Sequence, residues 1–517
     1  MKNRIKQYLL AASMCVGLTA CSDFFEPIPG VQFGLDETFA SKQRTEEYLN
    51  NVYSYVREVT DAIHPNTYGG IFTEASLDGA NRWNKTYAEW TNGSFNSASA
   101  QASEYFSKYY QAIAKASTFI QNVDKCTEAA ASTRGKWKSE ARALRAYYYF
   151  ELLRLYGPIP LIGEDPIPLD ASLEELIKER NSVDECVNFI ATELQSAIDS
   201  GDLLQRAGKA NLGRMDVATC MALKAKLYLY WASPLFNGNT DQASVKNKDG
   251  KQLFPQTEDH SKWTQTRDAY ERFMTFATGQ GYKLTEVYTN GKLDPYASCR
   301  AAGEFFTTTW EAVDELIFVK LRDLYDYTYW VCPKFTDFQD TDVTGGGGYY
   351  TTQETVDLFF TKDGLTIEED PGYDKFEGIP GANNFTSGRY YDPNNPSRLY
   401  FDADKSKVLK QWKDREPRFY VNITYSGSIW LNEGKYNEEM RTDFTNGANG
   451  TCGKSKASGD CPDSGYLIRR GAKASNNNGS KHFSPVLRLA DMYLGYAEAL
   501  CMCSDLDNAL TYLNKIR

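Results

Sequence analysis

The chain has 517 residues, and its 68 acidic against 57 basic residues give a formal net charge of −11. This acidic balance argues against a nucleic acid or another polyanion as the partner. Hydrophobic residues make up 42% of the chain, which suits a folded globular body, and no segment after the first twenty residues approaches the roughly 20 apolar residues of a membrane span.

The first element in the chain is a leader peptide. Three basic residues among the first six precede an apolar run from Tyr8 to Leu18, which is too short for a permanent membrane helix. The run ends in small residues directly before Cys21, a pattern typical of a lipoprotein signal. We therefore expect residues 1–20 to be removed and Cys21 to carry lipid, which anchors the protein to a membrane surface. An ordinary secretory leader with an incidental cysteine is the alternative.

Helical periodicity dominates the next part of the chain and returns at its end. Apolar residues recur at steps of three and four, so each set lines one face of a helix. The predicted helices cover Gln43–Val59 and Lys262–Ala277 and include the apolar stripes Ile113–Val123, Leu144–Leu155, Val187–Ile198, Cys220–Tyr230, Leu489–Ala499 and Leu506–Leu513. The predicted helices follow one another in pairs along the chain. We expect the helix of Ile113–Val123 to pack against the helix of Leu144–Leu155. The pattern predicts a mostly α fold, a tetratricopeptide-like helical-repeat scaffold of about eight helices.

Between these helices lies a loop-rich insertion. From Tyr282 to about Lys481 the chain is rich in Gly, Asn, Asp, Tyr, Thr and Pro, with short candidate strands at Glu315–Val319 and Phe419–Tyr425. The run Gly345–Gly348 is interpreted as a flexible lid or linker. We expect the insertion to fold back onto the helices and carry the binding site. The expected parts are a signal peptide (1–20), a helical region (21–281), a ligand-facing insertion (282–481) and C-terminal helices (482–517).

The cysteines show no spacing typical of a metal site, so neither a metal nor a cofactor is expected. Cys452 and Cys461 flank a loop rich in Gly, Lys and Ser, where a disulfide would close a short ring in an oxidising exterior. Cys186, Cys220 and Cys501 lie on apolar helical faces, which favours packing as their role.

Several strings in fixed order resemble a known family. They are Trp137–Phe150 with Leu155–Leu161, Gly213–Gly238, Arg415–Tyr420 and Leu487–Ala499. Together, behind a lipoprotein leader, they resemble the SusD/RagB family of outer-membrane nutrient-binding lipoproteins. Arg142 and Arg145 of the first string are interpreted as structural, pairing with acids such as Glu140 or with carbonyl groups. Members of the family usually continue past the position of Arg517, so the last helix is expected to be truncated.

The resemblance implies that the protein captures a glycan or another nutrient polymer and delivers it to a TonB-dependent transporter of the SusC kind. It also implies a lipid-anchored position on the outer membrane, exposed at the cell surface, and no catalysis. Aromatic residues make up 14% of the chain, and flat ring faces match the C–H faces of sugars. The candidate ligand-binding residues in loops are Asp78, Asn81, Arg82, Trp83, Trp90, Tyr296, Tyr329 and Trp330. For the tryptophans, structural burial is an equally weighted interpretation.

Three alternatives stay open at the level of sequence. A peptide asks for the same rings and hydrogen-bonding groups as a glycan, so a RagB-like peptide receptor is the nearest alternative. A glycoside hydrolase needs only two well-placed carboxylates, although the chain has three histidines and no Gly-x-Ser-x-Gly elbow. A scaffold that binds only the transporter is the third.

Overall fold

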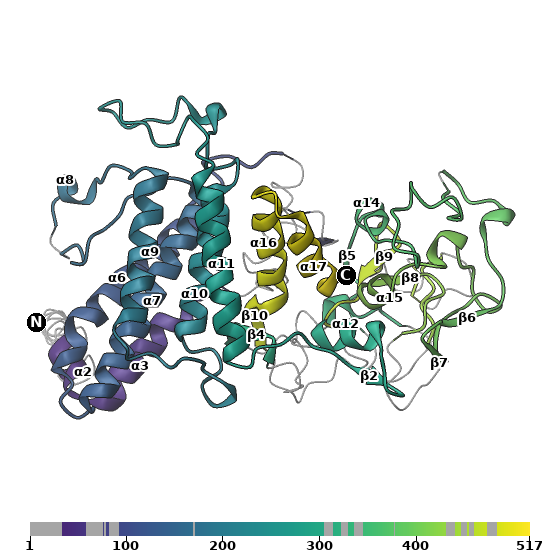
Figure 1. Cartoon of the computed structure of the whole chain (residues 1–517), viewed down its shortest axis with the longest axis horizontal. Helices are drawn as coiled ribbons and strands as arrows, with labels where there is room; N and C mark the ends of the chain where they lie inside the picture. Colours follow the sequence, from purple (N-terminus) through teal and green to yellow (C-terminus); the bar gives the residue numbers. More distant parts are fainter. Residues whose placement is uncertain are drawn as a thin grey trace, which may run out of the picture.

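The computed structural model describes residues 34–57, 76, 79–81, 93–168, 171–303, 314–321, 329–335, 345–376, 378–430, 440–445, 452–453, 460–472 and 483–517. The leader and Cys21 lie outside these ranges. Figure 1 shows a helical part on one side and a loop-rich part on the other, with the last two helices of the chain between them.

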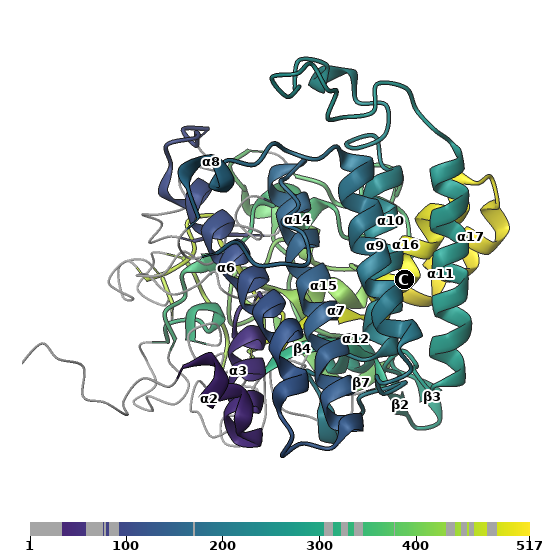
Figure 2. The same ribbon diagram turned by 90° about the vertical axis from the view of Figure 1, so that its left-hand side faces the viewer.

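The helical part confirms the predicted fold class, helix pairs carrying a large loop-rich region. Its helices are α2 (Leu35–Ala40), α3 (Lys42–Ser54), α6 (Ala100–Asn122), α7 (Ala131–Tyr156), α8 (Leu173–Leu176), α9 (Val183–Asp199), α10 (Val217–Ala232), α11 (Ser261–Gly279), α16 (Leu489–Met502) and α17 (Leu506–Ile516). Single 3-10 turns lie at Val123–Lys125, Lys209–Asn211 and Thr240–Gln242. Helices α6, α7, α9, α10 and α11 stand side by side in Figure 2.

Neighbouring helices pack through aromatic side chains. Tyr109 of α6 stacks on Tyr148 of α7 with ring centroids 6.0 Å apart, so the predicted pairing of these two helices is confirmed. Tyr496 of α16 contacts Tyr512 of α17 at 4.7 Å and stacks on Tyr270 of α11 at 6.3 Å. Such ring pairs contribute about 0.5–1.5 kcal/mol beyond the burial of their area. The C-terminal helices are thereby joined to the scaffold that the first half of the chain builds.

Local sequence sets where these helices begin and end. The Ser182 hydroxyl accepts a hydrogen bond from the Glu185 amide at the start of α9, and the Asp216 carboxylate accepts one from the Thr219 amide at the start of α10. Helix α7 ends at Gly157, whose φ of +68° is left-handed and whose missing Cβ leaves room for the Phe254 ring. Pro158 follows at once and prevents the helix from resuming.

The loop-rich part contains short helices and narrow sheets. The helices are α12 (Pro295–Gly303), α14 (Gln353–Asp357) and α15 (Pro417–Asn422), and 3-10 turns lie at Ala382–Asn384 and Lys410–Trp412. The strands are β1 (Ala80–Asn81), β2 (Tyr288–Thr289), β3 (Lys292–Leu293), β4 (Leu316–Leu321), β5 (Tyr349–Tyr350), β6 (Arg389–Asp392), β7 (Asn395–Asp402), β8 (Ile423–Tyr425), β9 (Tyr466–Ile468) and β10 (Phe483–Arg488). One sheet has the order β1-β5-β9-β8, and β4–β10, β2–β3 and β6–β7 form antiparallel pairs.

The main hydrophobic core belongs to the helical part. It extends from Phe39 to Ala509 along the chain, and none of its described members comes from residues 322–482. Strands β4 and β10 enter this core through Ile317, Phe318 and Leu487. Two smaller clusters, one around Val331 and Trp430 and one around Tyr400 and Phe419, hold the loop-rich part together.

Some predicted elements need correction. Helix α3 ends at Ser54, so the prediction of a helix to Val59 was too long. Only Ile423–Tyr425 of the predicted strand Phe419–Tyr425 is extended, because Pro417 in the first turn of α15 starts a short helix instead. The strand predicted at Glu315–Val319 is confirmed, with β4 at Leu316–Leu321.

The disulfide between Cys452 and Cys461, which the sequence leaves open, is not formed in this structure. Both residues are buried as thiols in the loop-rich part, where Cys452 belongs to the cluster around Val331 and Trp430. Burial of a thiol among apolar side chains is a common alternative to cross-linking. Packing in this cluster therefore accounts for Cys452.

Candidate functional site

The sequence-predicted binding residues divide into two groups. Asp78, Arg82, Trp83 and Trp90 lie outside the described residues, as does the predicted lipid attachment site Cys21. Asn81 is described through its backbone, as the last residue of β1. Tyr296, Tyr329 and Trp330 are described in full.

Strand β1 brings the first candidate segment beside the second. It pairs antiparallel with β5, with Ala80 opposite Tyr350 and Asn81 opposite Tyr349. Strand β5 is in turn paired with β9 through Tyr350 and Leu467. Segments separated by more than 250 positions in the chain therefore meet at one end of a four-stranded sheet. No local pattern in the sequence signals this pairing.

The run Gly345–Gly348 supports the second candidate segment. Its successive amides donate hydrogen bonds to carbonyls of the segment Tyr329–Pro333: Gly345 to Pro333 at 3.0 Å, Gly346 to Tyr329 at 2.8 Å, Gly347 to Cys332 at 2.9 Å and Gly348 to Trp330 at 3.2 Å. All four glycines are buried. The interpretation of this run as a mobile lid or linker was therefore wrong.

Glycine is required here because the two segments touch. A Cβ at Gly346 would overlap the Trp330 ring, and a Cβ at Gly345 would overlap the Cys332 carbonyl oxygen. The glycine run thus works as a flat wall against which the Trp330 ring lies. We call Tyr329, Trp330 and Gly345–Gly348 together the Trp330 platform.

The rings of the Trp330 platform are half-buried. Tyr329 and Trp330 meet edge to face, with ring centroids 4.9 Å apart and planes at 79°. Beneath them lie Val331, Tyr349 and Trp430, which form a fully buried cluster. A partly exposed ring that is held against a buried cluster matches the requirement for stacking on an apolar sugar face.

Tyr350 is a further candidate that the sequence reasoning missed. Successive side chains of a strand point to opposite faces, and Tyr349 of β5 is buried in the cluster below the platform. Tyr350 is half-buried and lies directly opposite Ala80, next to the segment that carries the first candidate group. Its position after a glycine run was visible in the sequence, but its partner strand was not.

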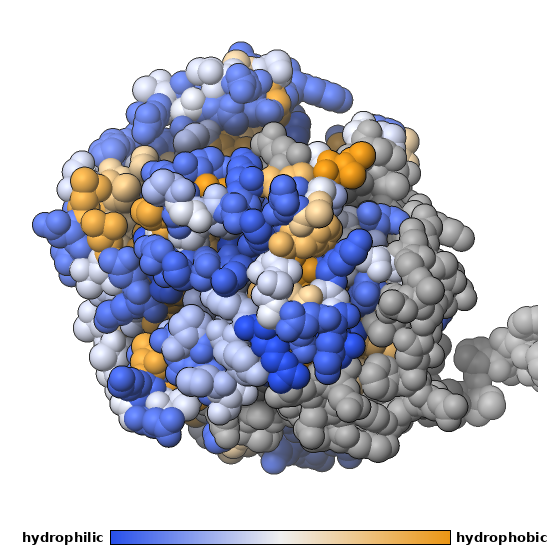
Figure 3. Space-filling view, turned by 90° about the vertical axis from the view of Figure 1, so that its right-hand side faces the viewer, coloured by the Kyte–Doolittle hydropathy of each residue, from blue (hydrophilic) through white to orange (hydrophobic). Residues whose placement is uncertain are grey.

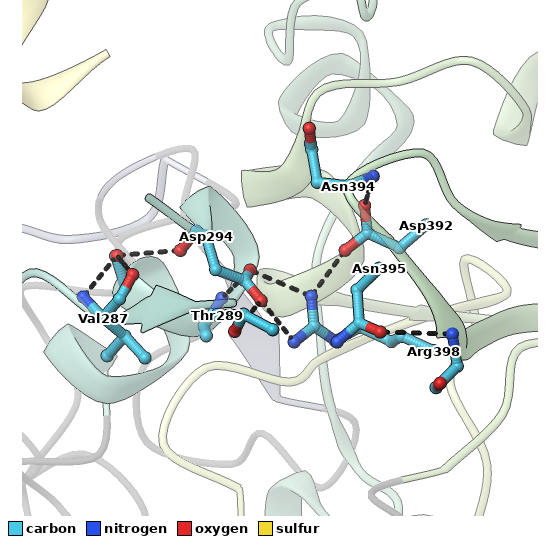
Figure 4. A network of polar contacts seen from close by, with 10 residues as sticks. Val287, Thr289, Asp294, Asp392, Asn394, Asn395 and Arg398 are labelled. Carbon is cyan, nitrogen blue, oxygen red and sulfur yellow. Dashed lines mark hydrogen bonds and ion pairs between the residues drawn. The ribbon is translucent and has the colours of Figure 1, made fainter. Parts of the chain in front are cut away.

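Tyr296 is kept away from the Trp330 platform by its own packing. It is 7% exposed, contacts Tyr400 at 5.6 Å and is covered by the Arg398 guanidinium 4.2 Å from its ring centroid. Arg398 is held by Asp294 at 2.9 Å and by Asp392 at 2.5 Å (Figure 4). The ring is therefore buried among these neighbours, and Tyr296 offers no stacking surface in this structure.

The network around Arg398 joins two parts of the loop-rich region. Asp294 precedes α12, whereas Asp392 ends β6, and one guanidinium bridges their carboxylates. Burial alone would raise the pKa of Asp294, but hydrogen bonds from Arg398, the Ala297 amide and Thr289 outweigh burial and lower the pKa. Both carboxylates are engaged in ion pairs with Arg398, so we interpret the network as structural.

A cavity lies on the helical part, away from the Trp330 platform. A cavity of about 420 Å³ is bounded by α6, the segment after α7 and α8, with Phe106, Tyr110, Ile162 and Ile177 among its walls. Its lining is largely apolar, and Lys178 is the one charged residue among the described residues that line it. A polyhydroxylated ligand needs converging hydrogen-bonding groups, which this cavity provides sparsely. The described part of its lining includes none of the predicted binding residues.

The outer face of the loop-rich part is mainly hydrophilic. Figure 3 shows that the described side chains on this face form a polar surface with small, separate hydrophobic patches. Among the described residues, no helix has the length and apolar character that crossing a membrane requires.

The fold places this chain in a class of proteins in which a helical scaffold carries a large loop-rich insertion, here with the Trp330 platform on that insertion. A profile described as the SusD family matches residues 315–517, and a profile described as "Starch-binding associating with outer membrane" matches residues 32–229. The two matches together span most of the chain. The chain belongs to the SusD family.

Individual relatives agree with this assignment. A SusD-like protein of Bacteroides ovatus is 27% identical over 175 residues, a match that covers 32% of this chain and 30% of that protein. The solved structure of BT4246 is similar with a TM-score of 0.75 at 23% identity, over 92% of this chain and 81% of that chain. The SusD-like carbohydrate binding protein BF0978 of Bacteroides fragilis has a TM-score of 0.57 at 17% identity, over 90% and 75% of the two chains. At these identities the structural likeness shows the fold.

Proposed function

We propose that this protein binds a glycan at the cell surface and delivers it to a SusC-like TonB-dependent transporter in the outer membrane. It acts as a receptor and has no catalytic role. The observation that carries the proposal is the Trp330 platform, where two partly exposed rings lie against a glycine wall beside the strand that leads into the segment of Asp78, Arg82, Trp83 and Trp90. Rings supply stacking, and the acid, amide and guanidinium groups supply orientation through hydrogen bonds.

The relatives favour a carbohydrate over a peptide. One similar structure is named a SusD-like carbohydrate binding protein, and one family profile is described as starch-binding. A peptide would also use aromatic rings, so a RagB-like peptide receptor is the second candidate. The proposed anchor is lipid on Cys21, which places the platform outside the cell on the outer membrane.

The test is binding by the purified protein to arrays of glycans and peptides, followed by calorimetry on the best ligand. We expect a glycan to bind and Trp330→Ala to weaken it about tenfold or more, because a stacked ring contributes on the order of 1.4 kcal/mol or more at the centre of a binding face. Tyr288→Ala is the matched control, since Tyr288 is 60% exposed on β2 and lies outside the platform. Equal loss in both variants, or binding of peptides alone, would contradict the glycan proposal.

Two further measurements separate the alternatives. Reducing-end analysis after long incubation with the bound glycan tests hydrolysis, and release of shorter sugars would favour a glycoside hydrolase. Membrane fractionation and co-purification with the SusC-like transporter of the same organism test the anchor and the partner. We expect Cys21→Ala to leave the membrane fraction while the purified variant keeps its affinity for the glycan.

A further inference from the structure

Arg469 is a buried cation in the centre of the loop-rich part. It directly follows β9 and is 7% exposed. Its amide donates to the Asn422 carbonyl at 2.7 Å, and its guanidinium lies 5.7 Å from the ring centroid of Trp430. The backbone and the aromatic neighbour therefore fix where this charge is placed.

The guanidinium of Arg469 has no counter-charge among the described residues. Its Nε is buried without a hydrogen-bond partner, and no described carboxylate or carbonyl group bonds its Nη atoms. Other buried arginines have partners for their terminal nitrogens: Arg145 binds Glu193, and Arg415, whose Nε is also unpartnered, donates from its Nη2 to the Val356 and Phe359 carbonyls. A buried charge without a partner is strongly unfavourable.

A small cavity lies next to this guanidinium. It has a volume of about 10 Å³, and Arg469, Arg300, Tyr296 and Ala472 line it together with Gly303 and Gly471. The two glycines leave space where side chains would otherwise fill it. This volume is room for one atom-sized occupant, either a water molecule or a monatomic ion.

The charges around the cavity favour an anion over water. Arg418 and Arg488 form ion pairs with Glu416 and Glu315, so these two acids are already engaged and neither supplies a counter-charge for Arg469. Burial lowers the pKa of Arg469, and the charge of Arg300 lowers it further. Burial and Arg470 lower the pKa of Arg488 to about 10. Water would fill the space and leave the Arg469 charge without a counter-charge.

We propose that a single monatomic anion of the size of chloride occupies this cavity and neutralises Arg469 beside Arg300. The occupant accepts hydrogen bonds from the guanidinium and carries no group that needs more space. It also connects to the binding face, because Ala472 of the cavity belongs to the cluster beneath the Trp330 platform. The anion is thus a built-in part of the support for that platform.

The first test compares halide with an anion that is too large for the cavity. Thermal unfolding of the wild type is followed in chloride and in gluconate at equal ionic strength. We expect the melting temperature to rise saturably with chloride, by about 2 °C or more, and to stay flat in gluconate. The same response to both salts would overturn the proposal, because general screening does not distinguish the two anions.

Variants assign the effect to the cavity. Arg469→Met removes the charge and keeps an unbranched side chain, so the chloride-specific rise should disappear while the protein stays folded in gluconate. Arg206→Met is the control, since Arg206 pairs with Asp314 outside the cavity, and its chloride response should match that of the wild type. A chloride response that persists in Arg469→Met would overturn the proposal.

Crystals of the wild type soaked in bromide give an answer that does not depend on any variant. We expect an anomalous peak between Arg469 and Arg300. Bromide found only at surface sites would overturn the proposal even if chloride stabilises the protein.

Discussion

Glu193 of α9 is the acid on which the interior of the helix pairs depends. Its carboxylate binds Arg145 at 2.5 Å and Arg142 at 3.1 Å, and Arg145 is fully buried with Ser117 as its other partner. Replacing Glu193 with Gln leaves the Arg145 charge buried with a weaker partner. We expect Glu193→Gln to lower the free energy of unfolding by about 3–5 kcal/mol, measured by urea denaturation.

Two further variants test whether the loss comes from the buried charge of Arg145. Arg142 is 24% exposed, so Arg142→Met should cost about 1 kcal/mol or less. The double variant Arg145→Met with Glu193→Gln removes both buried charges, and it should be more stable than Glu193→Gln alone. A double variant that is as unstable as the sum of its parts would show that the ion pair itself is not the source of the loss.

Asp216, at the start of α10, makes stability depend on pH in the direction opposite to most acids. Burial raises its pKa to about 6, although hydrogen bonds from Thr219 and the Ala207 amide oppose this shift. The folded protein therefore binds this proton more tightly than the unfolded chain, and stability from this group falls as the pH rises from about 4 to about 6.

Asp216→Asn should remove this fall, which amounts to about 3 kcal/mol at most between the two ends of the range. The measurement is urea denaturation at several pH values, with the slope against pH as the readout, because asparagine keeps the acceptor for Thr219 and loses the one for Ala207. Asp36→Asn is the contrast: hydrogen bonding and attraction to Lys125 lower the pKa of Asp36, so its contribution is lost as the pH falls. An unchanged slope in Asp216→Asn would contradict the assignment.

Single residues show what a linear sequence can and cannot say about partners. The helix faces of Arg142 and Arg145 and their structural role were predictable, because an arginine among tyrosines and alanines on a helix must pair inward. The acid that pairs with these arginines was not predictable. Glu140, the acid suggested from the sequence, instead binds Arg214 at 2.9 Å and accepts a hydrogen bond from the Tyr53 hydroxyl. Which acid meets which arginine is decided by helix packing, which the string does not contain.

At the scale of elements, the glycine run Gly345–Gly348 is the most sensitive support of the proposed binding face. A Cβ at Gly346 overlaps the Trp330 ring, so Gly346→Ala must displace that ring. We expect this variant to weaken glycan binding about as much as Trp330→Ala, because the ring moves away from its stacking position. Calorimetry measures the affinity, and tryptophan fluorescence reports the displaced ring.

Gly163→Ala is the matched control for this change. A Cβ at Gly163 meets nothing within 4 Å, and its φ is not left-handed, so both affinity and fluorescence should equal those of the wild type. If Gly346→Ala binds the glycan normally, the glycine wall does not position the ring, and the platform is not the binding surface.

The elements differ in how well the sequence predicted them, and the reason is the range of their interactions. Helices such as α9 and α10 repeat their apolar residues locally and carry their own caps, so both were found. Strands of two or three residues, such as β1 and β5, are defined only by a partner far along the chain. The glycine run was misread for the same reason, since its packing partner precedes it across a stretch of polar sequence.

At the scale of the whole molecule, the loop-rich part is inserted into the helical scaffold at one antiparallel strand pair. Leu321 ends β4 and lies opposite Phe483, where β10 begins, so the intervening chain leaves and returns at the same point. The main core contains Ile317, Phe318 and Leu487 from these strands and no described residue between positions 322 and 482. The helical part therefore holds its own core.

This arrangement predicts that the scaffold folds without most of the insertion. Replacing residues 322–482 with Asn-Gly joins β4 to β10 as a two-residue hairpin, the shortest connection that such a pair accepts. We expect the shortened protein to keep the circular-dichroism signal of its helices and a cooperative unfolding transition, while binding to the glycan is lost with the Trp330 platform. Loss of cooperative unfolding would show that the insertion stabilises the scaffold, and retained binding would place the glycan site on the helices.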